Sequence, residues 1–156
     1  MRQKLALLGD DCWIENDRGS RVYFVACKAF RLQEHLGFQD AQGNELAAIH
    51  ERVMRIKDTY RIYRKGKVLA TVKKVLISPT SQRFEVHVAG GMNMEAQGNI
   101  VEYEYEICEG RRKVAEVSKK WFLLADSYGV DIVAGADHIL VLAITVVIDM
   151  MLDRGA

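Results

Sequence analysis

The chain has 156 residues, of which 49% are hydrophobic and 28% are charged, and its formal net charge is +1. This length allows one domain with a sizeable core, and the balanced composition excludes extensive disorder. The three cysteines, Cys12, Cys27 and Cys108, are far apart and odd in number, which is typical of reduced thiols rather than of disulfides or a zinc site. The apolar stretch at 5–8 is too short for a secretory signal, so we expect a cytoplasmic protein.

The first third of the chain consists of short segments rich in β-branched and aromatic residues, separated by turn residues. This pattern is typical of strands. Two segments remain ambiguous by propensity. Residues 5–8 form an edge strand or a short helix, and 45–51 form a strand or a helix, with the spacing of the turns favouring a strand. The other predicted strands in this part are 12–14, 21–27 and 36–39.

The next unit is a β-hairpin. Residues 59–64 and 67–74 flank the two-residue turn Lys65-Gly66, and the glycine favours a tight turn. In the second strand we expect Lys67, Thr71 and Lys73 to share one face, with Val68, Ala70 and Val72 on the other. A further strand is predicted at 83–88.

The second half of the chain contains an alternating segment at 100–108, between predicted breaks at 90–91 and 97–99. Alternation of this kind predicts a strand with one buried and one solvated face. Strands at 114–118 and 121–124 are predicted to follow. The side chains expected on the buried face are Val101, Tyr103, Tyr105 and Ile107, and those expected in solvent are Glu102, Glu104 and Glu106.

A weak internal echo links two hairpins of the sequence. The segment from Tyr60 to Lys74 resembles the segment from Tyr105 to Lys120, with a slip of one residue, and both end in two lysines. One explanation is an internal duplication. The other is that charged hairpins resemble one another in any protein, and the sequence alone leaves both open.

A long apolar run at 132–152 ends the sequence and predicts a helix. It would be about 31 Å long, which is close to the thickness of a bilayer core. However, Asp137, His138 and Asp149 interrupt the run and leave only 139–148 free of ionisable side chains. Apolar runs of that length are more often buried core helices, so we predict a central core helix rather than a membrane span.

On a continuous helix, Asp131, His138, Thr145 and Asp149 would form a narrow polar stripe. One interpretation is a buried acid–base or ligand site. The interpretation we favour places Asp131 and Asp149 in solvent at the two ends of the helix. His138 and Thr145 would then bond to nearby backbone groups, as buried polar groups must.

The segment from Glu51 to Lys74 contains nine basic and two acidic residues, so it carries +7 while the remainder of the chain carries −6. A separation of this size attracts anionic partners. The alternative is an ordinary solvated hairpin whose charges serve solubility. The residues that we select as candidates for binding an anionic headgroup are Arg61, Lys65, Lys67, Lys73 and Lys74.

No sequence motif indicates chemistry. The chain has no nucleophile elbow, phosphate-binding loop, dinucleotide fingerprint, zinc-protease motif or calcium loop, and its four histidines are scattered. We therefore expect a protein that is not an enzyme and needs no metal or cofactor. Nucleic acid is not an expected partner, because the basic segment lacks a known nucleic-acid motif.

Several features together resemble the LURP-one-related proteins, a family similar in fold to the C-terminal domain of tubby proteins and to phospholipid scramblases. The resemblance covers residues 5–153 and depends on the order of hairpins and the terminal helix, not on a catalytic signature. The segments that carry it are 43–46 (Gly-Asn-Glu-Leu), the 60–74 hairpin, 121–122 (Trp-Phe), 128–131 (Tyr-Gly-Val-Asp) and the apolar run ending at Asp149.

The resemblance implies one domain over 1–156. Its fold would be a mainly β, closed antiparallel barrel of about twelve strands in two pseudo-repeated halves, enclosing 132–152 as a hydrophobic C-terminal α-helix. Tubby domains bind phosphoinositide headgroups through basic surface residues, but no tubby headgroup motif matches here residue by residue. Scramblases carry palmitoylated cysteines, a calcium-binding segment and a membrane helix, and the first two have no counterpart in this chain.

From these observations we expect a non-enzymatic binding module of the tubby-like superfamily, docking on anionic phospholipid at a membrane surface through a basic outer strip. One alternative is a regulatory scaffold that binds a protein partner through loops such as 89–99. The other is a scramblase-like membrane protein, suggested by helix length alone. The sequence does not predict the oligomeric state.

Overall fold

The computed structural model describes residues 2–8, 11–25, 35–51, 59–78, 81–120 and 127–154. The strand expected at 121–124 lies outside this part of the chain. The elements are β1 (Arg2–Leu8), β2 (Asp11–Glu15), β3 (Arg21–Val25), β4 (His35–Asp40), β5 (Glu45–Glu51), β6 (Thr59–Arg64), β7 (Lys67–Ser78), β8 (Ser81–Val88), β9 (Met94–Asn99), β10 (Glu104–Glu109), β11 (Arg112–Ser118), β12 (Ser127–Ile132) and α2 (His138–Arg154).

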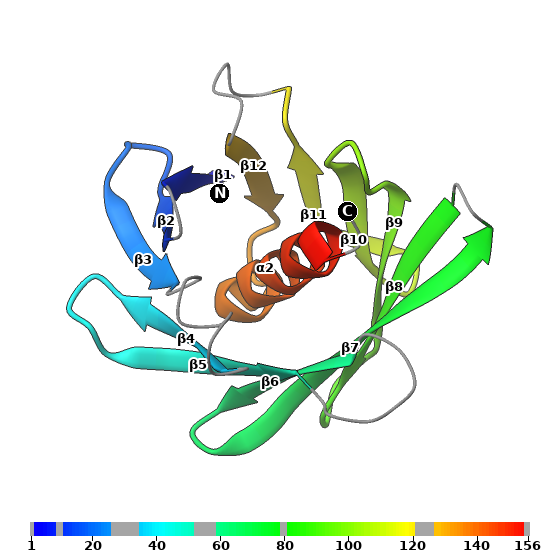
Figure 1. The fold of residues 1–156 in the computed structure, drawn as a ribbon, viewed down its shortest axis with the longest axis horizontal. Coiled ribbons are helices and arrows are strands. Elements are labelled where there is room, and N and C mark those ends of the chain that lie inside the picture. Colours follow the sequence, from blue (N-terminus) through cyan, green and yellow to red (C-terminus); the bar gives the residue numbers. More distant parts are fainter. Residues whose placement is uncertain are drawn as a thin grey trace.

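Each strand pairs antiparallel with its neighbours along the chain, and β1 pairs with both β2 and β12. The predicted mainly β fold, an antiparallel sheet with one C-terminal helix packed against it, is confirmed. The two ambiguous segments at 5–8 and 45–51 are both strands. Since it has a partner on each side, β1 is not the edge strand that its sequence suggested. In Figure 1 the strands are arranged around α2.

The inner face of the sheet and α2 together form the core. Where the structure describes the side chains, alternate strand residues face inward, and in β6 Tyr60 and Ile62 are fully buried beside more exposed neighbours. From Leu140 to Asp149 every residue of α2 is buried, and Thr145 and Asp149 are the only polar ones among them. Burying one large apolar side chain contributes about 1.5–3 kcal/mol, so this helix is a major source of stability.

The helix begins six residues later than the predicted start at Ile132. Ile132 instead ends β12, and the chain then turns at Gly135, whose φ of +86° is readily available only to glycine. Asp137 caps the helix, because its carboxylate accepts a hydrogen bond from the Leu140 backbone N–H at 3.1 Å. Apolar composition could not distinguish strand from helix here, whereas the turn and cap do.

The β6–β7 and β10–β11 hairpins pair their residues in the same way. Each hairpin has one register shift, which places an extra residue in its second strand: Leu69 in β7 and Val114 in β11. Such an extra residue is a β-bulge, and it reverses the alternation of faces beyond it. The equivalent cross-strand pairs are Tyr60–Val72 with Tyr105–Val117, Ile62–Ala70 with Ile107–Ala115, and Arg64–Lys67 with Glu109–Arg112.

The strand predicted at 100–108 begins only at Glu104, because residues 100–103 form a turn. Val101 is therefore 57% exposed instead of buried, and Tyr103 has a φ of +56°. The break predicted at 97–99 is wrong, since β9 continues to Asn99. Gly98 permits this arrangement, because a Cβ there would lie 3.0 Å from the Glu104 carbonyl oxygen.

Candidate functional site

The structure does not gather the five basic candidates on one surface. Arg61 is the cross-strand partner of Thr71, and both alternate with buried residues, so they lie on the outer face of the sheet. Lys73 lies two residues beyond Thr71 on the same face and is exposed. Lys65 is exposed in the turn that joins β6 and β7.

Lys67 and Lys74 lie on the other face. The bulge at Leu69 makes Lys67 the partner of Arg64, whose side chain points toward the helix end, and so separates Lys67 from Thr71. Lys74 pairs with the fully buried Phe84, which places it on the inner side of β7, where it is half-buried. The prediction that Lys67, Thr71 and Lys73 share a face is therefore wrong for Lys67.

The outer face contains a row of cross-strand neighbours that the sequence did not reveal, one from each of β5 to β8. We call His50, Arg61, Thr71 and His87 the Arg61 row. It contains no acidic residue. The row juxtaposes a guanidinium, a hydroxyl and two imidazoles, and these groups supply the donors that phosphate oxygens accept.

Arg61 is half-buried, and its Nε is covered without a hydrogen-bond partner. In the described part of the chain it also forms no ion pair. Next to it, the rings of His50 and Tyr63 meet edge to face with centroids 4.9 Å apart. Beyond Lys73 the surface also carries acidic residues. Lys73 pairs with Glu85, which already accepts a hydrogen bond from Arg83 at 3.2 Å.

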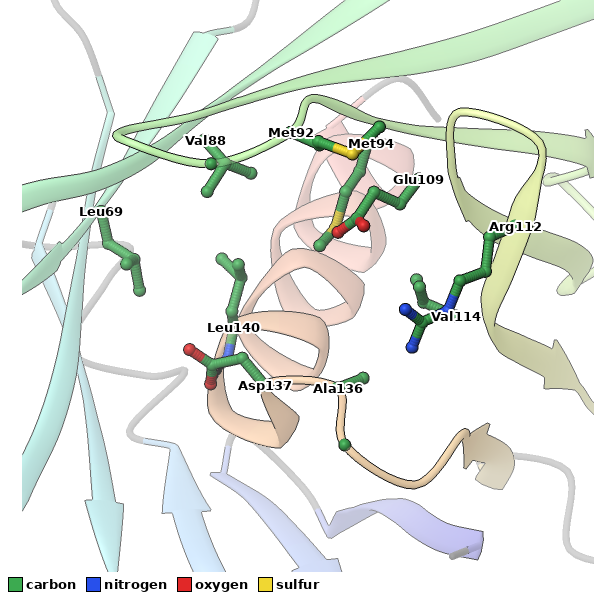
Figure 2. A pocket seen from close by; sticks show the side chains of 12 residues that line it. Leu69, Val88, Met92, Met94, Glu109, Arg112, Val114, Ala136, Asp137 and Leu140 are labelled. Carbon is green, nitrogen blue, oxygen red and sulfur yellow. Dashed lines mark hydrogen bonds between the residues drawn. The ribbon is translucent and has the colours of Figure 1, made fainter.

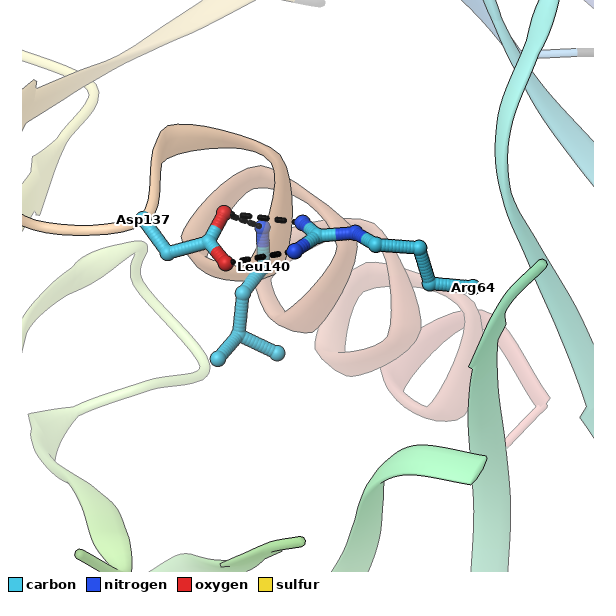
Figure 3. A network of polar contacts seen from close by, with 3 residues as sticks. All are labelled: Arg64, Asp137 and Leu140. Carbon is cyan, nitrogen blue, oxygen red and sulfur yellow. Dashed lines mark hydrogen bonds and ion pairs between the residues drawn. The ribbon is translucent and has the colours of Figure 1, made fainter. Parts of the chain in front are cut away.

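A second polar feature lies where α2 begins. The Arg64 guanidinium donates two hydrogen bonds to the Asp137 carboxylate, both 2.9 Å long (Figure 3). Burial acts to raise the Asp137 pKa, but hydrogen bonds from Arg64 and the Leu140 N–H outweigh it and lower the pKa below its ordinary value. The same bond raises the pKa of Arg64. Both groups are therefore charged at neutral pH, and they fasten the β6–β7 hairpin to the helix.

A cavity of about 330 Å³ opens beside this ion pair (Figure 2). The two bulge residues, Leu69 and Val114, belong to its wall, and so do the first turn of α2 and the loop before β9. Its wall combines apolar side chains with three charged ones. The remaining lining residues are Val88, Gly91, Met92, Met94, Glu109, Arg112, Gly135, Ala136, Asp137 and Leu140.

The opposite half of α2 contains a buried polar cluster. The Tyr103 hydroxyl donates a hydrogen bond to the Asp149 carboxylate, and Asp149 is only 6% exposed. The prediction that Asp149 lies in solvent is therefore wrong. Burial and the nearby Asp149 carboxylate raise the pKa of Tyr105 well above its ordinary value, so this phenol stays protonated. Thr145 bonds to the Val141 carbonyl at 2.9 Å, as expected from the sequence.

Asp131 lies on β12 and so is not part of the polar stripe expected on the helix, whereas His138, Thr145 and Asp149 do lie on α2. Among the described residues, no three His, Cys, Asp or Glu side chains are arranged to hold a metal ion. No helix in this part of the chain has both the length and the apolar character needed to cross a bilayer. Cys108 is a free, buried thiol, whereas Cys27 lies outside the described residues.

Sequence reasoning missed Asp137, Glu109 and Arg112. An aspartate just before an apolar run is a helix-start signal, and it could have identified Asp137 as the cap. The internal echo aligns the end of the first hairpin with the end of the second, and it could have directed attention to Glu109 and Arg112. Nothing in the sequence indicated the two bulges that bring these ends to one cavity.

Comparison with known proteins agrees with this architecture. The chain is 31% identical over 153 residues to the uncharacterized protein YxjI of Bacillus subtilis, covering 97% of this chain and 91% of that protein. A protein of Arabidopsis thaliana with an X-ray structure shares the fold at a TM-score of 0.73 and 15% identity, covering 96% of this chain and 90% of that one. The LURP-one-related family model matches residues 1–149. The chain therefore belongs to the LURP-one-related family.

Proposed function

We propose that this protein is a non-enzymatic binding module that docks on anionic phospholipid headgroups through the outer face of β5 to β8. Arg61 and Lys73 carry the interaction in this proposal, and Thr71 lies between them. Lys65 is near the edge of the surface, at the hairpin turn. We assign no headgroup contact to Lys67 and Lys74, because the register places them on the opposite face.

The observation that carries the proposal is the state of Arg61. The side chain lies half-buried on the outer face and forms no ion pair in the described part of the chain, so its guanidinium is available to an incoming acceptor. The Arg61 row adds donors on both sides and no competing carboxylate. A phosphate has several acceptor oxygens, and a guanidinium is suited to bind them in pairs.

The fold provides a rigid base for this surface. We propose that it is the closed barrel of the tubby-like superfamily, in which the wall surrounds the C-terminal helix. Support comes from the pairing of β1 with both β2 and β12 and from the burial of α2 along 140–149. Because side chains on regular strands are held by pairing on both sides, the outer face of β5 to β8 presents its donors in fixed positions.

The test is co-sedimentation with phosphatidylcholine vesicles that contain or lack phosphatidylinositol bisphosphate. We expect pelleting only with the anionic lipid and release at high salt, because exposed charges are screened. Arg61→Gln and Lys73→Gln should each weaken partitioning about fivefold, since one basic residue near an anionic surface contributes about 1 kcal/mol.

Lys67→Gln is the matched control, because it removes the same charge from an exposed lysine in the same hairpin. It should leave pelleting nearly unchanged. Equal, negligible pelleting with both vesicle types would reject headgroup binding. Pelleting that falls equally in all three variants would instead show that net charge matters and that the Arg61 row does not.

The second candidate is a scaffold that binds a protein partner through the loop between β8 and β9. This loop spans 89–93, shorter than the predicted 89–99, and Met92 in it is 61% exposed. The candidate predicts a specific partner in pull-downs that persists in Arg61→Gln and Lys73→Gln but is lost in Met92→Ser. Loss of the partner in the two charge variants would contradict it.

A further inference from the structure

The cavity at the start of α2 is built from the ends of the two equivalent hairpins. Leu69 and Val114 are the bulge residues of these hairpins, and both line the cavity. Met92 and Met94 line it beside the loop before β9, and Leu140 lines it from the first turn of the helix. The bulges therefore help to form the site, because they place the Leu69 and Val114 side chains at one cavity.

The charged groups at this cavity differ in how they are engaged. The Asp137 carboxylate accepts hydrogen bonds from Arg64 and from the Leu140 backbone N–H, so it has little capacity left to bind a ligand. Glu109 and Arg112 are different. They form no ion pair with each other, and neither has a polar side-chain partner among the described residues. In Figure 2 the Glu109 carboxylate lies beside Met94, and the Arg112 guanidinium lies beside Val114.

The separation of Glu109 and Arg112 is set by the sheet. They are cross-strand partners that flank the turn at 110–111, and Cβ atoms of such partners are about 4.5–5.5 Å apart. The Glu109 carboxylate and the Arg112 guanidinium are therefore close enough to bind one ligand whose positive and negative groups are close together. A simple anion is disfavoured, because it would meet the Glu109 carboxylate as well as the Arg112 guanidinium.

The size of the cavity limits the apolar part of the ligand. The helix fills the interior beyond it, since Val141, Leu142 and Ile144 are fully buried. A long acyl chain that extended inward would meet these buried side chains. A volume of about 330 Å³ is at the lower end of the range for small-molecule pockets, which is about 300–1,000 Å³. A short branched or thioether chain can pack against Met94, Val114 and Leu140.

We propose that this cavity binds a small zwitterion with a short apolar side chain, of the class of free α-amino acids. The ammonium group lies against the Glu109 carboxylate, and the carboxylate lies against the Arg112 guanidinium. The apolar side chain packs on Met94, Val114 and Leu140. This site is separate from the Arg61 row on the outer face, so each proposal can fail without the other.

The first test is isothermal titration of the full chain with L-leucine, leucinamide and 4-methylpentanoate. Leucinamide lacks the carboxylate, and 4-methylpentanoate lacks the ammonium group. We expect saturable binding of leucine with a Kd of about 1 mM or tighter, and binding of each analogue weaker by about tenfold or more, because each analogue leaves either Glu109 or Arg112 without its charged partner. No saturable binding of leucine up to about 10 mM would overturn the proposal. Equal binding of either analogue would also overturn it.

The second test locates the site by substituting exposed or half-exposed residues, so the variants should fold normally. Glu109→Gln and Arg112→Gln should each weaken leucine binding about tenfold or more. Glu106→Gln on the outer face and Arg111→Gln in the turn are matched controls that should bind leucine unchanged, because neither residue lines the cavity. Thermal unfolding confirms that all four variants are folded. Leucine binding that survives in both cavity variants, or is lost equally in the controls, would refute the assignment.

Discussion

The two hairpins β6–β7 and β10–β11 have the same pairing and different ends. In both, a buried tyrosine and a buried isoleucine face the core, and one bulge follows at the same point. At the end of the first hairpin Arg64 is bound to Asp137 and secures the helix. At the equivalent position of the second hairpin, Glu109 has no polar side-chain partner among the described residues and lines the cavity.

The outer faces of the hairpins also differ. Arg61 and Thr71 form one cross-strand pair of the first hairpin, and the equivalent pair in the second is Glu106 with Glu116. Lys113 offsets these two carboxylates, at 3.6 Å and 3.1 Å respectively. The two hairpins therefore share their core-facing side chains and their backbone pairing, and they differ in the side chains at their ends and on the outer face.

The largest expected effect tests whether the hairpins are equivalent in the core. Ile62→Ala and Ile107→Ala should each lower the free energy of unfolding by about 2–5 kcal/mol, because both side chains are fully buried and leave a cavity. Urea denaturation of the two variants measures this. A loss below about 1 kcal/mol in one variant and a normal loss in the other would break the equivalence.

The next effect tests the difference between the hairpin ends. Asp137→Ala removes the helix cap and the partner of Arg64, so it should lower the free energy of unfolding by about 1–2 kcal/mol. Glu109→Ala should stay within about 0.5 kcal/mol of the unmodified chain, since this side chain holds nothing in place. Thermal or urea unfolding distinguishes the two, and equal losses would contradict the contrast.

A pH experiment isolates the Asp137 carboxylate. Its pKa in the folded protein is below the ordinary 3.8, so its stabilising contribution is complete above that value and is lost as the pH falls through the lowered pKa. Asp137→Asn should therefore unfold at a lower Tm than the unmodified chain at neutral pH, and the difference in Tm should narrow as the pH falls below 3.8. A gap that is constant with pH would show that the carboxylate charge has no role.

The smallest effect concerns the turns. Lys65 and Gly66 have φ values of +50° and +77°, whereas in the second turn, within the described chain, only Gly110 has a positive φ, of +61°. The first turn therefore suits asparagine followed by glycine. Lys65→Asn should raise the free energy of unfolding by a few tenths, up to about 0.5 kcal/mol, because lysine adopts positive φ at a cost. Urea unfolding checks it, and a loss of stability would show that the lysine side chain contributes.

Much of the fold could be predicted from residue patterns. Alternation in 59–64 and 67–74 depends only on which side chains avoid water, and a glycine marks the turn between them. The apolar run predicted the core helix because few other arrangements bury so many adjacent apolar residues. The start of the helix could not be predicted from apolar composition, because the residue types at 127–137 suit a strand buried on one side as well as a core helix.

The candidate sites were harder to predict, because they depend on bulges. One extra residue at Leu69 moved Lys67 away from Thr71, and no propensity distinguishes a bulged leucine from a regularly paired one. The burial of Asp149 could not be predicted either, because it depends on Tyr103 from a turn distant in sequence. By contrast, the outer-face position of Arg61 follows from simple alternation with Tyr60 and Ile62.

The pairing of β1 with β12 has a consequence for biosynthesis. Residues 2–8 leave the ribosome long before their partner at 127–132 and the helix at 138–154. Until the helix has been made, nothing covers the apolar inner surface of strands β2 to β11. Because such distant contacts form slowly, the nascent chain must be shielded from its neighbours, and a stalled or shortened translation product is a target for proteolysis and aggregation.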